Sequence, residues 1–298
     1  YAGNYIGMIS RMDRKAGYSK RVNAYPQMHD GQAGRDIKYR FQWNAPIRIS
    51  QHNPEVVYHC SQYVHKTTDG GNNWEVISPD LTTNKDAYLD IPGGPIQHDH
   101  TGVELYCTIF AFEESPHQEG ELWAGSDDGL VHISRNGGGK WENITPKDMP
   151  EEGTVNNIDL SAHEPGRAFM SVYKYRDNDF RPYIFMTNNY GKKWTLLTNG
   201  ENGIPADHFV RVVREDPVRK GLLRAGGGEL VQRAGGPGAP ERDGADPRSA
   251  GGDPSRGPDC GAPFASAGEP KVSPGDRRAL GGTGASASDR GGQLPGTG

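Results

Sequence analysis

KTTDGGNNWEVISPD, residues 66–80, contains a pattern that occurs twice more, as SRNGGGKWENITP at 134–146 and TNNYGKKWTLLTN at 187–199. Aligned, the three copies read Ser/Thr–x–Asp/Asn–x–Gly–x–x–Trp, followed by an alternating run. The copies recur at intervals of roughly 50 to 65 residues, a spacing typical of solenoids and propellers. The pattern positions are Thr67, Asp69, Gly71 and Trp74, then Ser134, Asn136, Gly138 and Trp141, then Thr187, Asn189, Gly191 and Trp194.

Each copy has the residue types of a tight turn with a hydrophobic anchor. An Asp or Asn side chain accepts hydrogen bonds from backbone N–H groups further along the turn, and a Ser or Thr hydroxyl can brace the same turn. The glycine supplies a positive φ. We expect the tryptophan, at the start of the next strand, to bury its ring between layers. Because two of the three copies carry Asn, we interpret Asp69 as structural and not as a catalytic acid.

Composition describes a polar chain of 298 residues with a net charge of −5 and a mean hydropathy of −0.78. This charge leaves no basic surplus for nucleic acid, and no run approaches the ~18 apolar residues of a membrane span. The three cysteines, Cys60, Cys107 and Cys260, are too few and too scattered for a disulfide framework or a zinc site. We therefore expect no metal and no cofactor, and we interpret the first two cysteines as small buried hydrophobes.

The two ends of the chain differ from its middle. Residues 1–22 lack a signal-peptide pattern and alternate like strands already under way, so we interpret the N-terminus as a truncation. Residues 224–298 are dominated by Gly, Ala, Pro, Arg, Asp and Ser, with Phe264 as the single aromatic residue. Such a segment buries too little apolar surface to fold. We favour out-of-frame translation of a GC-rich gene over a natural disordered tail, and we divide the chain into a propeller fragment, 1–223, and a disordered segment, 224–298.

Each repeat also has a front half, in which a strand, a proline-containing turn and a second strand precede the motif turn. A third strand leads into the motif turn and a fourth begins at its tryptophan. Four-stranded antiparallel units with an aromatic marker are typical of β-propellers. We predict an all-β partial propeller with about three full blades, the end of a blade before residue 25 and the start of one after residue 207. Three blades cannot close a ring, so we expect the complete domain to contain further blades. The front halves are IRISQHNPEVVYHC, TIFAFEESPHQEGELWAG, IDLSAHEPGRAFMSVY and VRVVREDPVRKGLLRAG.

The three motifs resemble Asp-boxes, also called BNR repeats, which occur in sialidases, xyloglucanase-type glycoside hydrolases and the sortilin luminal domain. The sequence of residues 1–223 outside the motifs also resembles a bacterial branch of sortilin-like, BNR-repeat glycosyl-hydrolase-like proteins. The resemblance implies a secreted or periplasmic protein, but it does not fix the function, because this propeller serves both enzymes and receptors. The stretches that carry it are KYRFQWNAPIRIS, TGVELYCTIFAFEESP, LWAGSDDGLVHISRNGG, NDFRPYIF and RVVREDPVRKGLL.

Antiparallel alternation places the motif turns on one face of the propeller. The loops between second and third strands, and the links between blades, lie on the opposite face. Ligands of propellers resembling this one usually bind on that opposite face, where loops carry function. The segments that lie there are 78–104, GSDDG at 125–129, 174–183 and 198–208. They supply the candidate ligand-binding residues His98, Asp99, Glu104, Asp127, Asp128, Asp179 and Arg181.

Each candidate also has an ordinary structural interpretation. In an extended loop the side chains of His98 and His100 point to opposite sides, so we favour a solvated loop over a metal site. Asp127 and Asp128 precede Gly129, which is also a common turn sequence. Arg181 can clamp a carboxylate or stack on a sugar, and it can equally brace a loop.

A glycosidase needs two carboxylates about 5–9.5 Å apart, one protonated and one ionised. The candidate catalytic carboxylates are Glu104, Asp127, Asp128 and Asp179. Neither the two aspartates of the xyloglucanase-type enzymes nor the sialidase arginine triad can be aligned here. We therefore favour a sortilin-like module that recognises a peptide or glycan on the long-loop face. The alternatives are a glycoside hydrolase acting on a polysaccharide and a purely structural repeat module.

Overall fold

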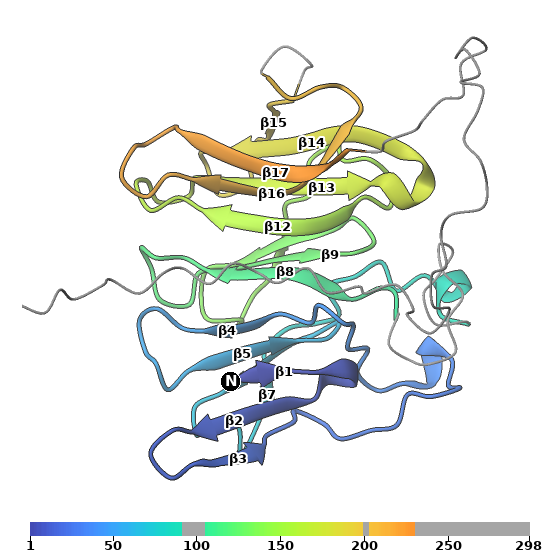
Figure 1. Cartoon of the computed structure of the whole chain (residues 1–298), viewed down its shortest axis with the longest axis vertical. Helices are drawn as coiled ribbons and strands as arrows, with labels where there is room; N and C mark the ends of the chain where they lie inside the picture. Colours follow the sequence, from blue (N-terminus) through green and yellow to red (C-terminus); the bar gives the residue numbers. More distant parts are fainter. Residues whose placement is uncertain (91–104, 199–202, 230–298) are drawn as a thin grey trace, which may run out of the picture. The chain divides into compact units, whose positions relative to one another are not determined.

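A computed structural model of the chain describes residues 1–90, 105–198 and 203–229, and these are built mainly from β-strands. The strands form three complete four-stranded antiparallel sheets, preceded by a three-stranded sheet and followed by a two-stranded one (Figure 1). In each complete sheet the spatial order of the strands is their order in the chain. The predicted partial β-propeller is confirmed, with three full blades between two incomplete ones.

The first complete sheet comprises β4 (Ile47–Ile49), β5 (Val57–Cys60), β6 (Val64–Thr67) and β7 (Glu75–Val76). The second comprises β8 (Ile109–Glu114), β9 (Leu122–Ser126), β10 (Val131–Ser134) and β11 (Glu142–Asn143). The third comprises β12 (Thr154–Leu160), β13 (Ala168–Lys174), β14 (Asp179–Thr187) and β15 (Thr195–Leu196). The incomplete sheets are β1 (Ala2–Gly3), β2 (Ile9–Asp13) and β3 (Tyr18–Arg21), and β16 (His208–Glu215) with β17 (Leu223–Glu229). Short 3₁₀ helices are η1 (Tyr5–Gly7), η2 (Gly34–Asp36), η3 (Asp86–Tyr88) and η4 (Tyr175–Asp177).

The last strand extends past the domain boundary expected from composition. β17 pairs with β16 from Leu223 to Glu229, so the pairing crosses the expected boundary after residue 223. Residues 230–298, which make up most of the segment interpreted as out-of-frame sequence, lie outside the described residues.

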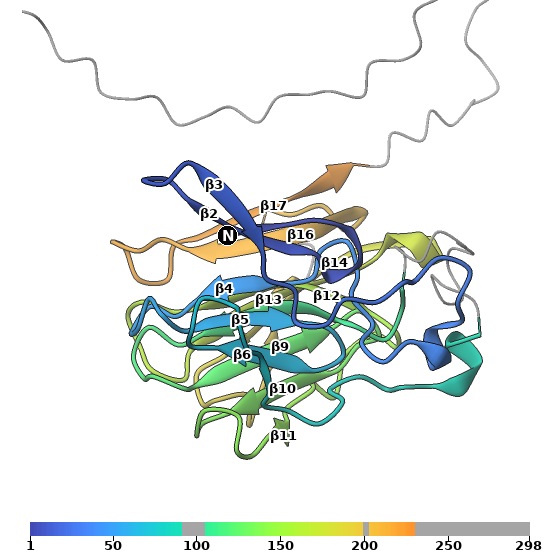
Figure 2. The same cartoon turned by 90° about the horizontal axis from the view of Figure 1, so that it is seen from below.

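Neighbouring sheets pack on one another through the apolar side chains of their strands. Each sheet is a meander, and Figure 2 shows β4, β5 and β6 following one another across the first complete sheet, and β9, β10 and β11 across the second. Because side chains alternate between the two faces of a strand, each sheet contributes to two cores. Buried residues between the first and second complete sheets include Tyr58, Phe112 and Leu122; between the second and third, Trp123, Val155 and Phe185; and between the third and the last, Phe169 and Val213.

The three tryptophan turns, 67–74, 134–141 and 187–194, are built alike. In each, the Ser or Thr hydroxyl donates to the Asp or Asn side-chain oxygen, at 2.9, 3.1 and 3.0 Å. The same hydroxyl accepts from the glycine N–H, at 3.0, 2.9 and 3.1 Å. Side chain and backbone groups of the turn itself therefore supply these closing hydrogen bonds.

Each tryptophan also bonds to the preceding sheet. The indole N–H groups donate at 2.9, 2.9 and 2.6 Å to the backbone carbonyls of Val22, Ile77 and Ile144. Ile77 and Ile144 directly follow the outermost strands β7 and β11. Val22, which follows β3, occupies the equivalent position, so β1–β3 are the last three strands of an earlier blade.

The tryptophan rings are half-buried, and those of Trp141 and Trp194 pack against the cores between sheets. Each ring sits just before an outermost strand of only two residues, where the neighbouring sheet covers one side of it. The fully buried tryptophan is Trp123, on the second strand of its sheet.

A second repeated contact joins consecutive sheets at the hairpin between their first two strands. It involves the segments Ser50–His52, Ser115–His117 and Ser161–His163, in which the serine hydroxyl accepts from the histidine N–H. Each imidazole Nε2 then contacts a carbonyl oxygen of the next sheet, that of Ser115, Ser161 or Asp216, at 2.8, 2.9 and 2.8 Å. A carbonyl only accepts, so each Nε2 carries a proton. The Ser–x–His spacing is a signal of sheet-to-sheet contact that strand and turn patterns do not reveal.

Candidate functional site

Different connections between strands lie on the two faces of the blades. The tryptophan turns lie beside the hairpins between first and second strands, because Gly137 and Tyr190 donate to the carbonyls of Gly120 and Gly166, both at 2.9 Å. The described parts of the link between β7 and β8 lie at the other ends of the strands, at the right of Figure 1. We call this second face, with the loops between second and third strands, the loop face.

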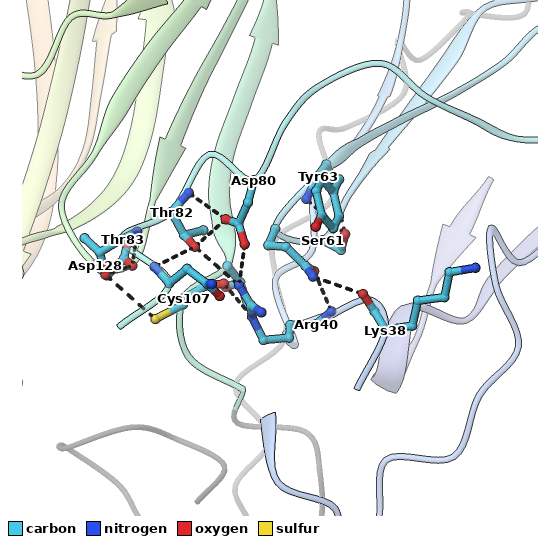
Figure 3. A network of polar contacts seen from close by, with 12 residues as sticks. Lys38, Arg40, Ser61, Tyr63, Asp80, Thr82, Thr83, Cys107 and Asp128 are labelled. Carbon is cyan, nitrogen blue, oxygen red and sulfur yellow. Dashed lines mark hydrogen bonds and ion pairs between the residues drawn. The ribbon is translucent and has the colours of Figure 1, made fainter. Parts of the chain in front are cut away.

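Arg40 is buried in a polar network that joins separate segments of the loop face (Figure 3). Its guanidinium donates to Asp80 at 2.9 Å, to the Thr82 hydroxyl at 3.3 Å and to the Cys107 carbonyl at 3.0 Å. Its backbone N–H donates to Gln62 at 2.7 Å. A guanidinium with its donors spread over several loops fixes those loops relative to one another.

Asp127 and Asp128 follow β9 and are both buried, with 4% and 3% of their surface exposed. Asp127 accepts from the N–H and the hydroxyl of Thr108, at 2.8 and 2.7 Å. Asp128 accepts through Oδ2 from the N–H and the hydroxyl of Thr83, at 2.8 and 2.7 Å. Each aspartate therefore ties the loop after β9 to a different part of the link between β7 and β8.

The aspartate pair lies in a weakly solvated environment. Burial, with the charge of Asp128, raises the pKa of Asp127 well above 3.8, although hydrogen bonds from Thr108 oppose the shift. Burial likewise raises the pKa values of Tyr106 and Cys107 above their ordinary range. Among the described residues, Asp128 Oδ1 and the Tyr106 hydroxyl are buried polar atoms without a hydrogen-bond partner. A carboxyl group with a raised pKa beside a second carboxyl group is an arrangement that acid–base chemistry uses.

Three of the six non-glycine residues with positive φ in the described ranges lie in links between sheets. Asn84, Cys107 and Glu152 have positive φ angles of 48°, 58° and 57°, a region that residues other than glycine rarely adopt. Glu152 accepts hydrogen bonds from Tyr88 and Lys85. Such strain persists only where the surroundings over-determine the conformation, so these links are held in one shape.

Asp179 and Arg181 lie at the start of β14, in the third complete sheet, and form a separate pair. The Arg181 guanidinium donates to the two Asp179 oxygens at 2.9 and 2.6 Å, and the Tyr183 hydroxyl donates to Oδ2 at 2.7 Å. Hydrogen bonds from Arg181 hold the pKa of Asp179 far below 3.8. Asp179 is therefore an ionised acceptor, and Arg181 braces the start of the strand.

The remaining sequence-predicted residues, His98, Asp99 and Glu104, lie outside the described residues. The structure brings Asp127 and Asp128 together and places Asp179 with Arg181. It also shows that Arg40, Thr83 and Thr108 belong to the polar contacts of the loop face, although no local sequence pattern predicted a role for them. Within the described ranges, no three His, Cys, Asp or Glu side chains are grouped as metal ligands. No helix in those ranges has the length and apolar character needed to cross a membrane.

No family model and no curated protein matches the chain. Among solved structures, the chain is similar to a GH74 enzyme from Niastella koreensis, with 13% identity and a TM-score of 0.45 over 73% of this chain and 29% of that one. It is similar to YCF48 bound to a D1 peptide, with 18% identity and a TM-score of 0.34 over 61% of this chain and 50% of that one. It is also similar to the β-propeller domain of Cps50 (Swd1) from Myceliophteria thermophila, with 11% identity and a TM-score of 0.43 over 74% and 60%. The chain spans less than two thirds of each of these proteins.

Proposed function

We propose that the chain is part of an Asp-box propeller of the sortilin-like, BNR-repeat type that recognises a peptide or glycan on its loop face without transforming it. One observation carries this proposal. Every candidate catalytic carboxylate within the described ranges already accepts hydrogen bonds from the chain's own side chains, as Asp127, Asp128 and Asp179 show. Carboxylates used in this way hold loops in place, as a rigid binding surface requires.

The tryptophan turns support the Asp-box assignment. Their hydroxyl, carboxylate or amide, and glycine groups make the same contacts in all three copies. In the first copy, hydrogen bonds led by the Asn73 backbone N–H lower the pKa of Asp69 to about 2. Asp69 is therefore a permanent acceptor, a role that the Asn residues of the other copies also fill.

A glycoside hydrolase is the second candidate, and the raised pKa of Asp127 beside the Asp128 carboxylate favours it. Glycosidases use one protonated and one ionised carboxyl group on either side of a sugar bond. The two aspartates here are adjacent in sequence and buried, and each holds a threonine of the link. These contacts favour a structural pair over an acid and a base that flank a substrate.

Asp127→Asn and Asp128→Asn decide between the two candidates. An Asn oxygen can still accept from the threonine N–H, and its amide can donate to the threonine hydroxyl, so we expect both variants to fold and to bind ligand like the wild type. Asp127→Ala removes both acceptors, and we expect it to lower the free energy of unfolding by about 1–3 kcal/mol. Sugar release by the wild type from a polysaccharide panel, lost in the folded Asn variants, would establish the hydrolase instead.

Hydrogen exchange with a bound ligand tests the binding function directly. A peptide or glycan on the loop face should slow amide exchange in residues 78–90 and 174–183. Exchange in the tryptophan turns, on the other face, should stay unchanged and serves as the internal control. If no peptide or glycan in a broad panel changes exchange anywhere, the chain is a structural repeat module and the proposal fails.

A further inference from the structure

The first strands of four consecutive sheets, β4, β8, β12 and β16, line a pocket of about 220 Å³. We call it the inner-strand pocket. It is smaller than the roughly 300–1,000 Å³ of sites for drug-sized ligands, so it fits one unit of a polymer or one small group. The side chains that matter below are Arg48, Phe110, Glu113, Asn156, Arg211 and Arg214.

Three of these strands carry a β-bulge at the same place. The register shifts between Ile109 and Ala111 in β8, between Val155 and Asn157 in β12, and between Val210 and Val212 in β16. The extra residues are Phe110, Asn156 and Arg211, and all three line the inner-strand pocket. A bulge re-aims a side chain, and bulges are frequent beside functional sites. Three equivalent bulges therefore place Phe110, Asn156 and Arg211 around one cavity, where the Asn156 amide donates to the Arg211 backbone carbonyl at 2.5 Å.

Arg211 is a fixed cation on the pocket wall. Its guanidinium lies 5.5 and 5.6 Å from the ring centres of Tyr173 and Tyr175, and it donates to the Tyr175 hydroxyl at 3.3 Å. Tyr175 in turn stacks on Phe209, with ring centres 4.5 Å apart. No ion pair joins Arg211 to a carboxylate among the side chains that the structure describes. Aromatic rings thus hold the guanidinium while leaving its charge available to an anion.

The other charged groups of the pocket are paired. Arg48 donates twice to Glu113 Oε1, at 2.9 and 2.8 Å, and Arg214 forms an ion pair with Asp159 at 2.7 Å. The Glu113 carboxylate beside the pocket disfavours more than one negative charge on the unit that the pocket holds. It suits a ligand with hydroxyl groups, because a carboxylate accepts and a guanidinium donates.

We propose that the inner-strand pocket, which lies on the first strands and not on the loop face, binds a uronic acid unit of an acidic polysaccharide. This inference rests on the proposed recognition of a glycan and adds a second contact site for it. The ligand carboxylate pairs with Arg211, hydroxyl groups bond to Asn156 and to the Arg48–Glu113 pair, and the sugar ring packs against Phe110. The amide, guanidinium and carboxylate groups around the cavity can hydrogen-bond to the hydroxyls of a sugar ring and can pair with its single carboxylate. A peptide C-terminus offers the charge without the hydroxyls, so we favour the sugar.

Calorimetric titration of the full chain with trigalacturonic acid tests the proposal. The same trisaccharide with its carboxyl groups reduced to neutral alcohols is the matched ligand. We expect Arg211→Gln to weaken trigalacturonate binding by about tenfold or more, the usual effect of losing a charge-assisted hydrogen bond. Arg211→Lys should restore part of the affinity, because it keeps the charge but not the planar fork. Asn156→Ala should also weaken binding. Arg219→Gln, an exposed arginine in the β16–β17 hairpin, should change nothing.

The outcomes separate this inference from the proposed function. Equal binding of the acidic and the reduced trisaccharide, or binding insensitive to Arg211, overturns the uronate site while recognition of glycans stands. Tighter binding of a tripeptide with a free carboxylate, lost in Arg211→Gln, overturns it in favour of a peptide. If the wild type binds no glycan and no peptide, the inference and the proposed function both fall. Arg211 is exposed, so its variants should lose little stability, and a cooperative thermal unfolding transition verifies that they are folded.

Discussion

Single residues show how tightly the tryptophan turns constrain their backbone. In the second turn Gly137 and Gly138 have φ angles of +71° and +97°. A Cβ on Gly137 would meet nothing within 4 Å, whereas one on Gly138 would lie 2.5 Å from the carbonyl oxygen of Ile77. The third turn has Tyr190 at the first of these positions, with φ +61°. The first position therefore accepts a side chain at the cost of strain, and the second accepts none.

This difference predicts unequal effects of the same substitution. Gly137→Ala adds only strain at positive φ, and we expect it to lower the free energy of unfolding by about 1 kcal/mol. Gly138→Ala adds the same strain and an overlap with the neighbouring sheet, and we expect a loss of about 2–4 kcal/mol. Urea denaturation of both variants measures the difference. Equal losses would show that the contact with Ile77 does not limit this position.

At the scale of elements, each blade is held to its neighbours by hydrogen bonds on the same face as the tryptophan turns. The indoles of the turns reach back to the preceding sheet, and the hairpin histidines reach forward to the next one. Both bonds end on backbone carbonyls, so they do not depend on the identity of the accepting residue. The apolar cores between sheets vary in composition, while these two contacts repeat. They join each pair of successive blades in the same way.

Trp141→Phe tests the indole bond. The variant keeps an aromatic ring beside the core between the first and second complete sheets, but it leaves the Ile77 carbonyl without its donor at 2.9 Å. We expect the free energy of unfolding to fall by about 1–2 kcal/mol. Trp43→Phe, at an exposed site outside the turns, is the matched control and should change stability much less. Similar losses in the two variants would mean that ring size matters and the indole bond does not.

Local patterns predict the blades well and the loop-face contacts poorly. The strands, the proline hairpins and the tryptophan turns follow from alternation and turn chemistry within a few residues, and the structure has them where expected. Arg40 contacts Cys107 across 67 positions of sequence, and no short pattern encodes such a contact. The bulges lie between these extremes. In a regular strand the buried apolar residues are two positions apart, but the buried Val210 and Val213 are three apart because the bulge adds one residue. This spacing can be recognised as a bulge only once the pairing of the strands is known.

At the scale of the whole molecule, histidines with lowered pKa values make the stability of the fold depend on pH. His59 and His65, on β5 and β6, are buried beside Phe41, with the ring centres of His59 and Phe41 4.7 Å apart. Burial lowers the pKa of His65 to about 3 and also lowers that of His59. Burial lowers the pKa of His132, on β10, to about 4. Each ring must stay neutral for the first two complete sheets to keep their packing.

These shifts predict that the propeller loses stability as the pH falls below about 6.5. The unfolded chain protonates His65 near pH 6.5, while the folded chain resists protonation until about pH 3. The contribution of His65 is therefore complete above pH 6.5 and declines on acidification, by about 2 kcal/mol at pH 5. Urea denaturation between pH 7.5 and pH 4.5 should show the decline, and His65→Gln should flatten it. A slope that is the same in the wild type and in His65→Gln would show that protonation of other groups sets the acid limit.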